Sequence, residues 1–116
     1  MTKPFYLTTA IDYANGDPHL GHALEKIGAD VMARWRRLGG EPVHFVMGMD
    51  EHGQKVLQAA QASGREPAAY TDAISERFES TWRGLACSHD DRIRTTQPRQ
   101  RAAVTPLIER TRERNP

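Results

Sequence analysis

Short apolar runs alternate along this chain with longer segments in which apolar residues recur at every third or fourth position. Residues 5–11 (FYLTTAI) and 43–49 (VHFVMGM) are rich in aromatic, β-branched and other apolar side chains, which favours buried strands. The turn residues NGDP follow the first run, and the polar residues DEHG follow the second. Residues 92–96 are a third, shorter strand candidate.

The segment between the first two predicted strands has the periodicity of a helix. Its apolar residues recur at spacings of three and four, which marks one face of a helix that begins at His19. Gly39 and Gly40 end this helix, because glycine enters the left-handed capping conformation without a side-chain clash. The apolar face consists of Leu20, Ala23, Leu24, Ile27, Val31, Trp35 and Leu38.

Three more helices are predicted beyond the second strand. A short one covers residues 54–62, and a longer one comes next with an apolar face made of Tyr70, Ile74, Phe78, Trp82 and Leu85. Pro98 is well placed to begin the last helix, which reaches toward Asn115. Pro106 lies inside this last segment and lacks the amide hydrogen that a helix interior needs. We therefore expect a kink there, or two helical pieces with Thr105 capping the second.

This order of elements predicts the fold class. Strand, helix, strand and helix in succession imply an α/β protein with a parallel sheet and right-handed crossovers. In such sheets, ligands bind at the carboxyl ends of the strands. The motifs NGDPHLGH (15–22) and GMDEHG (48–53) come just after, or at the end of, the two strands, so we expect them to converge on one crevice.

Composition restricts the classes of partner. Sixteen basic and 15 acidic residues give a net charge of +1, so no global field favours nucleic acid or a membrane surface. Hydrophobic residues make up 38% of the chain and the mean hydropathy is −0.68, so the core is thin. No apolar run approaches membrane-spanning length. The single cysteine, Cys87, excludes an internal disulfide and favours a reducing, cytoplasmic location.

The first motif suits a nucleotide phosphate. A helix that begins near His19 presents unpaired backbone amides and the positive end of its dipole, which attract anions. His19 and His22 lie one helical turn apart and add imidazole donors, and Gly21 lets a nucleotide lie close to the backbone. Such donors can stabilise charge that develops at the α-phosphorus of a nucleotide. The alternative is that both histidines are surface residues on the first turn of a helix.

The second motif supplies a carboxylate at the end of a strand. Asp50 can hold the ammonium group of an amino acid, or it can cap the helix that follows. Ile11 and Tyr13 end the first strand and can wall an apolar pocket, although core packing is the commoner fate of such residues. Glu25, one turn past His22, can reach a ribose hydroxyl or can lie on a solvated helix face.

A metal site is a less favoured alternative. The possible ligands are His19, His22, Asp50 and His52. Nothing in their spacing fixes a tetrahedral set, so we predict no metal site in this chain.

These residues together resemble the amino-terminal part of the methionyl-tRNA synthetases, a family of class I aminoacyl-tRNA synthetases. HLGH (19–22) is similar to the class signature HIGH, and the wider frame YANGDPHLGHALE is similar to the bacterial members. GMDEHGQK (48–55) is similar to the family's second block, G-T-D-E-H-G-Q-K, and DDRIRTTQPR (90–99) resembles a third segment. The match is collinear over nearly the whole chain.

The resemblance implies that residues 1–116 form the amino-terminal half of a Rossmann-type catalytic domain. The full-length enzyme would activate L-methionine with ATP and Mg²⁺ and transfer it to tRNA(Met), without a membrane partner. His19 and His22 would be the catalytic residues. The resemblance places His19, Gly21, His22 and Glu25 in the ATP site, and Ile11, Tyr13 and Asp50 in the methionine site. No metal is expected within this segment, because the family's zinc site lies in another part of the enzyme.

The chain also departs from the family pattern. Ala10, Asp12 and Met49 stand where relatives often carry proline, an aromatic residue or proline, and threonine. The lysine-rich second signature of the family, K-M-S-K-S, does not occur in these 116 residues, so we expect them to be inactive as a ligase by themselves. Two alternatives stay open: a nucleotide-binding module without ligase activity, and an H-x-G-H nucleotidyltransferase.

Overall fold

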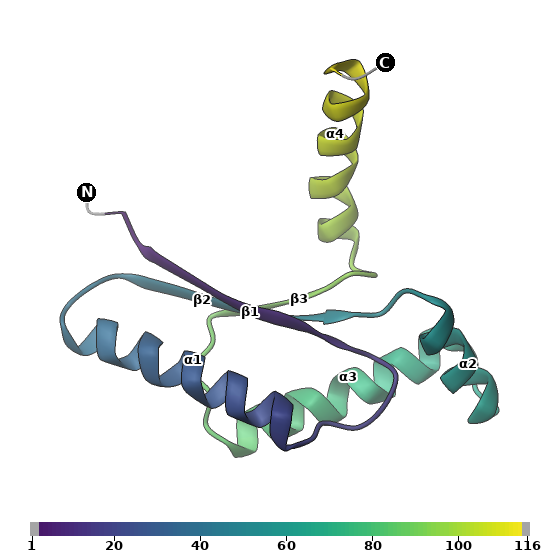
Figure 1. Ribbon diagram of the computed structural model, residues 1–116, viewed down its shortest axis with the longest axis horizontal. Helices are drawn as coiled ribbons and strands as arrows, with labels where there is room; N and C mark the ends of the chain where they lie inside the picture. The colour runs from purple at the N-terminus through teal and green to yellow at the C-terminus, as the bar shows by residue number, and fades with distance from the viewer. Residues whose placement is uncertain (1–2, 115–116) are drawn as a thin grey trace.

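A computed structural model describes residues 3–114 as a three-stranded parallel sheet with four helices (Figure 1). The strands are β1 (Phe5–Tyr13), β2 (Val43–Asp50) and β3 (Asp91–Arg94). The helices are α1 (Leu20–Leu38), α2 (Gln54–Ala62), α3 (Pro67–Gly84) and α4 (Pro98–Arg114). The predicted α/β class is confirmed. Asn115, toward which the last helix was predicted to reach, lies outside the described residues.

The strand β2 lies at the centre of the sheet, between β1 and β3. Tyr13 and Asp50, the last residues of β1 and β2, are partners in the register. The loops that lead from these strands into α1 and α2 therefore leave the sheet at the same end (Figure 1). This end is where the fold class predicts a ligand site.

One face of the sheet carries the core. Figure 1 shows α1 and α3 on the same side of the sheet, with α4 standing away on the other side. The aromatic residues Phe78 and Trp82 of α3 are almost fully buried against Phe45 and Met49 of β2. The apolar face predicted for α3 is thus confirmed at its central positions, whereas Leu85 caps the helix end and is 42% exposed.

The apolar face predicted for α1 is correctly placed on a helix but is not buried. Leu20, Trp35 and Leu38 are 88%, 74% and 85% exposed. The residues of α1 that are buried are Lys26, Asp30 and Ala33. The helix therefore turns a mostly polar face toward the sheet, and this face carries ion pairs that the periodicity could not reveal.

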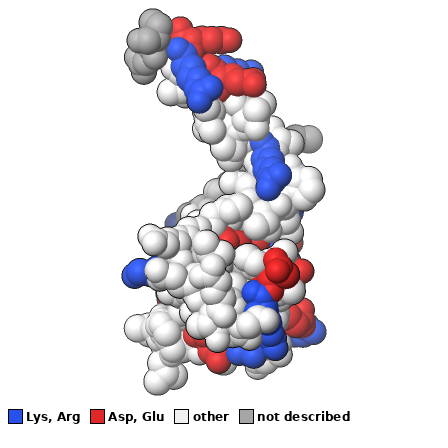
Figure 2. Space-filling view, turned by 90° about the vertical axis from the view of Figure 1, so that its right-hand side faces the viewer, with Lys and Arg blue, Asp and Glu red and all other residues white. Residues whose placement is uncertain are grey.

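The helix α4 runs without a break through Pro106, so the prediction of two helical pieces is wrong. Proline removes one hydrogen bond, to the carbonyl of Ala102. Ala102 is exposed, so water can satisfy this carbonyl. No described residue of α4 is buried, and Figure 2 shows the helix projecting from the body with charges of both signs near its end.

The third strand is shorter than predicted, because pairing with β2 ends at Arg94. Thr95 and Thr96 turn away from the ladder: the Thr95 amide donates to the Met49 carbonyl, and both hydroxyls contact Glu51. Within residues 3–114, none of the helices has the length and apolar character to cross a membrane.

Candidate active site

The two histidines of the first motif form the cap of α1. His19 is the N-cap residue, and its Nδ1 accepts a hydrogen bond from the Gly21 amide at 3.1 Å. The Nδ1 of His22 accepts from the His19 amide at 3.2 Å, which completes a reciprocal capping box. The rings stack with centroids 3.8 Å apart. Two of the amides that we expected to be free for an anion are therefore bonded to imidazoles.

This capping fixes the tautomer of both rings. A neutral imidazole whose Nδ1 accepts a hydrogen bond carries its proton on Nε2. His19 and His22 therefore each keep an Nε2–H group, which is available to donate to a phosphate oxygen. At these two positions the imidazole Nε2–H groups, and not the backbone amides, are the donors available to an anion.

The ring of His22 rests on the core. Its centroid lies 5.2 Å from that of Phe78 on α3, in an edge arrangement. Burial lowers the pKa of the His22 imidazole, while the Asp12 carboxylate raises it and the neighbouring His19 lowers it further. Because the net direction is down, His22 is a neutral hydrogen-bond donor at neutral pH, which suits a residue that binds phosphate without exchanging protons.

Below His22 lies a buried ion cluster that the sequence analysis did not predict. The Lys26 side chain is fully buried, and its Nζ lies 2.8 Å from Asp12 Oδ1 and 2.9 Å from Glu25 Oε2. Burial raises the pKa of the Asp12 carboxyl more than the hydrogen bond and charge of Lys26 lower it. Among the described residues, Asp12 Oδ2 is buried without a hydrogen-bond partner. Asp12, which departs from the family pattern, thus has Lys26 as its counter-ion. The apolar periodicity of the helix gave no reason to single out this lysine.

Glu25 does not lie on a purely solvated face. Its side chain is 42% exposed, yet Oε1 accepts a hydrogen bond from the Ala10 amide at 2.9 Å and Oε2 accepts from Lys26. Burial alone would raise the pKa of the Glu25 carboxyl, but these hydrogen bonds outweigh it and lower the pKa. Both carboxylate oxygens of Glu25, which was predicted to bind the ribose, therefore accept hydrogen bonds from within the protein.

The residues predicted to bind the amino-acid substrate lie at the ends of β1 and β2. Ile11 is 51% exposed, so it is not a core residue, and its side chain packs where a Cβ on Gly48 would clash. The Tyr13 hydroxyl lies against Gly53, at a place where a Cβ would collide with it and where φ is +118°. Glycine is therefore required at 53 for two reasons, and it brings the second motif against the end of β1.

Asp50 does not cap α2, so that alternative is wrong. The N-cap of α2 is Gly53, and no side chain in the described part of the chain makes a capping hydrogen bond there. Among residues 3–114, the Asp50 side chain accepts only one long hydrogen bond, 3.4 Å, from the His52 amide. It is partly exposed, and its carboxylate keeps acceptor capacity at the strand end.

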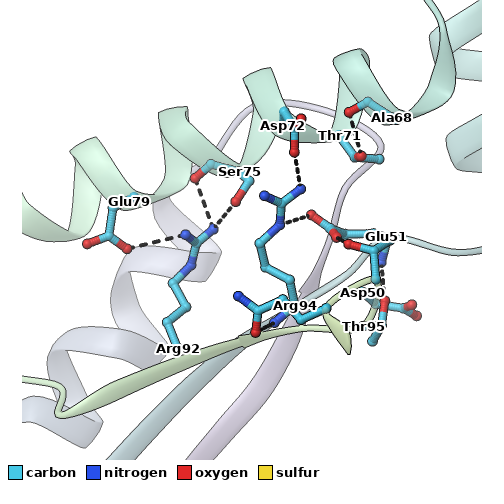
Figure 3. Close-up of polar contacts among 12 residues, drawn as sticks. Asp50, Glu51, Ala68, Thr71, Asp72, Ser75, Glu79, Arg92, Arg94 and Thr95 are labelled. Atoms are coloured by element: carbon cyan, nitrogen blue, oxygen red, sulfur yellow. Dashed lines mark hydrogen bonds and ion pairs between the residues drawn. The ribbon is translucent and has the colours of Figure 1, made fainter. Parts of the chain in front are cut away.

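Glu51, the neighbour of Asp50, anchors the second motif to β3 and α3 (Figure 3). Its side chain is fully buried, and Oε1 lies 2.6 Å from Arg94 Nε. Its amide donates to the Thr95 hydroxyl at 3.0 Å. Arg94 also pairs with Asp72 of α3, so one arginine joins the motif to the helix layer. A buried charge fixed in this way holds the backbone beside Asp50 in place.

Arg92 makes a parallel set of contacts (Figure 3). It donates to the Ser75 carbonyl and hydroxyl and pairs with Glu79 at 3.3 Å. Arg92 and Arg94 were not singled out from the sequence, although two arginines at alternate positions of a strand point to the same face. That alternation was the available signal for both residues.

The metal alternative finds no support in the geometry. Within residues 3–114, no group of three or more His, Cys, Asp and Glu side chains is placed to hold a metal ion. The four residues considered as ligands are instead divided: His19 and His22 lie at the α1 cap, and Asp50 and His52 lie at the end of β2 and in the loop after it.

Comparison with known proteins decides the family. The sequence profile described as "tRNA synthetases class I (M)" matches residues 5–115. The chain belongs to this family. It is 48% identical over 109 residues to the methionine–tRNA ligase of Deinococcus radiodurans, an alignment that covers 93% of this chain and 16% of the relative. It is 50% identical over 102 residues to that of Rhizobium meliloti, covering 88% and 20%.

Solved structures agree with these sequence matches. The methionyl-tRNA synthetase of Mycobacterium tuberculosis bound by methionyl-adenylate superposes with a TM-score of 0.81 at 48% identity. That match covers 83% of this chain and 19% of the relative's. The chain thus spans about a fifth or less of the length of the relatives it matches. The Rossmann-like α/β fold of this family is the fold described above.

Proposed function

We propose that this chain supplies the first half of an adenylation site, which activates L-methionine with ATP in a methionine–tRNA ligase. The observation that carries the proposal is the juxtaposition of two strand ends. Tyr13 and Asp50 pair at the ends of β1 and β2, and the His19–His22 cap opens the helix that follows β1. An amino-acid carboxylate and a nucleotide phosphate can meet at such an edge.

In the proposed reaction, a carboxylate oxygen of methionine attacks the α-phosphorus of ATP. A bond forms between these atoms, and the bond from the α-phosphorus to the bridging oxygen breaks, so pyrophosphate leaves with that electron pair. The Nε2–H groups of His19 and His22 donate to phosphate oxygens as negative charge shifts among them. Donors aimed at developing charge are typically worth about 3–4 kcal/mol of transition-state stabilisation.

Asp50 is proposed to bind the ammonium group of methionine, and Ile11 and Tyr13 to line the side of its pocket. Support comes from the free acceptor capacity of Asp50 and from the exposure of Ile11 at the strand end. Gly21, at the first turn of α1, is proposed to lie beside the nucleotide, and its missing Cβ leaves room for the His19 ring, which would lie 3.0 Å from such an atom. Mg²⁺ is proposed to accompany ATP, and tRNA(Met) to accept the methionyl group in the cytoplasm.

Methionine-dependent exchange between ATP and pyrophosphate tests the proposal. The gene product that carries this sequence is expressed at its full length and assayed with methionine, leucine and isoleucine. We expect exchange with methionine alone, and Asp50→Ala should raise the methionine KM while leaving the ATP KM nearly unchanged. Losing a buried charged partner costs about 2–5 kcal/mol. Exchange that needs no amino acid would instead favour the nucleotidyltransferase alternative.

Equal weakening of methionine and ATP binding by Asp50→Ala would contradict the assigned role. A matched control is Glu76→Ala, which removes an exposed carboxylate of α3 whose pair with Arg83 is 3.6 Å long. Glu76 is outside the proposed pocket and outside the network of Glu51 and Arg94, so the control should leave the ratio of the two KM values unchanged.

A further inference from the structure

The strand β1 carries one extra residue opposite β2. Thr8 pairs with Val46 and Ile11 pairs with Gly48, so three steps along β1 match two along β2. This register shift is a β-bulge, which bends a strand and inserts an unpaired residue. Thr9 and Ala10 have no partner in the register on β2.

The backbone of Ala10 is bonded by side chains of α1. Its amide donates to Glu25 Oε1 at 2.9 Å, and its carbonyl accepts from Lys26 Nζ at 2.9 Å. Two consecutive residues of the helix therefore hold both polar groups of one strand residue. Backbone amides and carbonyls that are not paired within the sheet need other hydrogen-bond partners. Here the partners are charged side chains, which make stronger hydrogen bonds than neutral groups.

The Lys26 ammonium has a partner for each of its three hydrogens. These are the Ala10 carbonyl, Asp12 Oδ1 and Glu25 Oε2, at 2.8–2.9 Å. An ammonium group has only three donors. With its side chain fully buried, Lys26 is fixed in position, and it fixes the three groups around it.

The bulge decides which way the end of β1 faces. Before it, Phe5 and Leu7 are partly buried while Tyr6 and Thr8 are exposed. After it, Asp12 is buried and Ile11 is exposed. A shift of one residue exchanges the two faces of a strand. The bulge therefore turns Asp12 toward Lys26 and turns Ile11 out, to the side where the proposed pocket lies.

We propose that Glu25 and Lys26 are positioning residues that clamp the bulge at Ala10 and so set the orientation of the methionine-binding end of β1. The family resemblance implies that Glu25 contacts the nucleotide sugar, whereas the geometry assigns it to the strand. The helix that begins with the phosphate-binding histidines thereby also shapes the amino-acid pocket. The statement about the pocket rests on the proposed function; the clamp itself does not.

Hydrogen exchange at the Ala10 amide tests the clamp directly, by NMR on the full-length protein. Glu25→Ala removes the acceptor and should speed exchange at this amide by about tenfold or more, as expected for the loss of a hydrogen bond to a charged group. Glu25→Gln keeps an oxygen acceptor and should retain most of the protection. The control is Glu76→Ala, because Glu76 is an exposed α3 residue whose Arg83 pair is 3.6 Å long. Unchanged Ala10 exchange in Glu25→Ala would overturn the clamp.

Exchange kinetics with ATP and pyrophosphate test the consequence for the pocket. Glu25→Ala should raise the methionine KM by about tenfold, since displacing a binding wall is costly, and should leave the ATP KM within about twofold. A raised ATP KM with an unchanged methionine KM would overturn the positioning role in favour of a sugar contact. If the unmodified protein shows no methionine-dependent exchange at all, the proposed function fails, and the Ala10 measurement still decides the clamp.

Discussion

The helices α1 and α3 have equally regular apolar stripes, but only α3 buries its stripe. Ile74, Phe78 and Trp82 are at most 4% exposed, whereas Leu24 and Trp35 of α1 are 77% and 74% exposed. The inward face of α1 instead carries Lys26 and the mostly buried Asp30. A stripe at helical spacing identifies residues that share a face, but it does not say which face meets the sheet.

The difference also separates two kinds of packing. The apolar face of α3 is held by area removed from water, which tolerates small displacements. The polar face of α1 is held by directed bonds: Asp30 accepts from the Ser88 amide at 2.6 Å and from Arg34 Nε at 2.6 Å. A site that needs fixed geometry is therefore built on the helix with the directed contacts, and α3 supports it through Phe78.

The largest effect is expected from Phe78→Ala on α3. Phe78 is fully buried and contacts both Trp82 and the ring of His22. Removing a buried phenyl ring should lower the free energy of unfolding by about 3–5 kcal/mol. Trp35→Ala on α1 is the matched control and should change it by less than about 0.5 kcal/mol. Chemical denaturation compares the two, and equal losses would mean that the α1 stripe is covered in solution.

A loss of about 3 kcal/mol is expected from Lys26→Met, which leaves Asp12 buried without its counter-ion. This is the low end for a broken buried pair, because burial already raises the pKa of the Asp12 carboxyl and the group can take up a proton. The double variant Lys26→Met, Asp12→Leu should recover most of the loss. Denaturation of all three proteins measures it; a double variant no better than the single one would show that the Ala10 and Glu25 contacts dominate.

His22→Asn should reduce the turnover of ATP–pyrophosphate exchange by about tenfold or more, equivalent to about 1.4 kcal/mol. Asparagine keeps a donor but shortens its reach, so the ATP KM should change less than the turnover. Glu76→Gln on the exposed side of α3 is the control and should leave both values unchanged. Unchanged turnover with a raised ATP KM would make His22 a residue that binds substrate and transition state equally.

The smallest effect concerns pH. Because burial lowers the pKa of His22, the unfolded chain binds a proton at this residue more readily than the folded chain does. The free energy of unfolding therefore rises with pH just below 6.5, the ordinary pKa of histidine, and the contribution of His22 to stability is lost as pH falls through this window. His22→Gln should flatten the profile below about pH 6.5, because glutamine takes up no proton in either state. Thermal unfolding across this window compares His22→Gln with the unmodified protein.

The sequence predicted the elements of the fold well, because each strand and helix had its own local signal. Six of the seven elements have a boundary marked by glycine, proline or a polar turn close to where the structure has it. The exception is the end of β3, where Thr95 and Thr96 continue a β-like composition but turn to contact Glu51. Tertiary contacts overrode local preference there.

The residues of the candidate site were predicted by motif, but their supports were not. Lys26 pairs with Asp12, and Glu51 pairs with Arg94. The partners in each pair lie far apart in the sequence, so the spacing of residues along the chain does not reveal the pairs. Gly53 illustrates the limit, since it looked like a turn residue and proved to be the place where the Tyr13 hydroxyl fits. A contact such as this one, between residues far apart in the sequence, can be recognised only once the strands are paired.

The position of α4 has a consequence for the dimensions of the molecule in solution. The radius of gyration is 16.6 Å, whereas a compact domain of this length has a value of about 13 Å. A single exposed helix standing off the sheet thus acts as a lever arm that contributes to the apparent size. Small-angle scattering from this chain would therefore report chiefly on the angle at the β3–α4 junction.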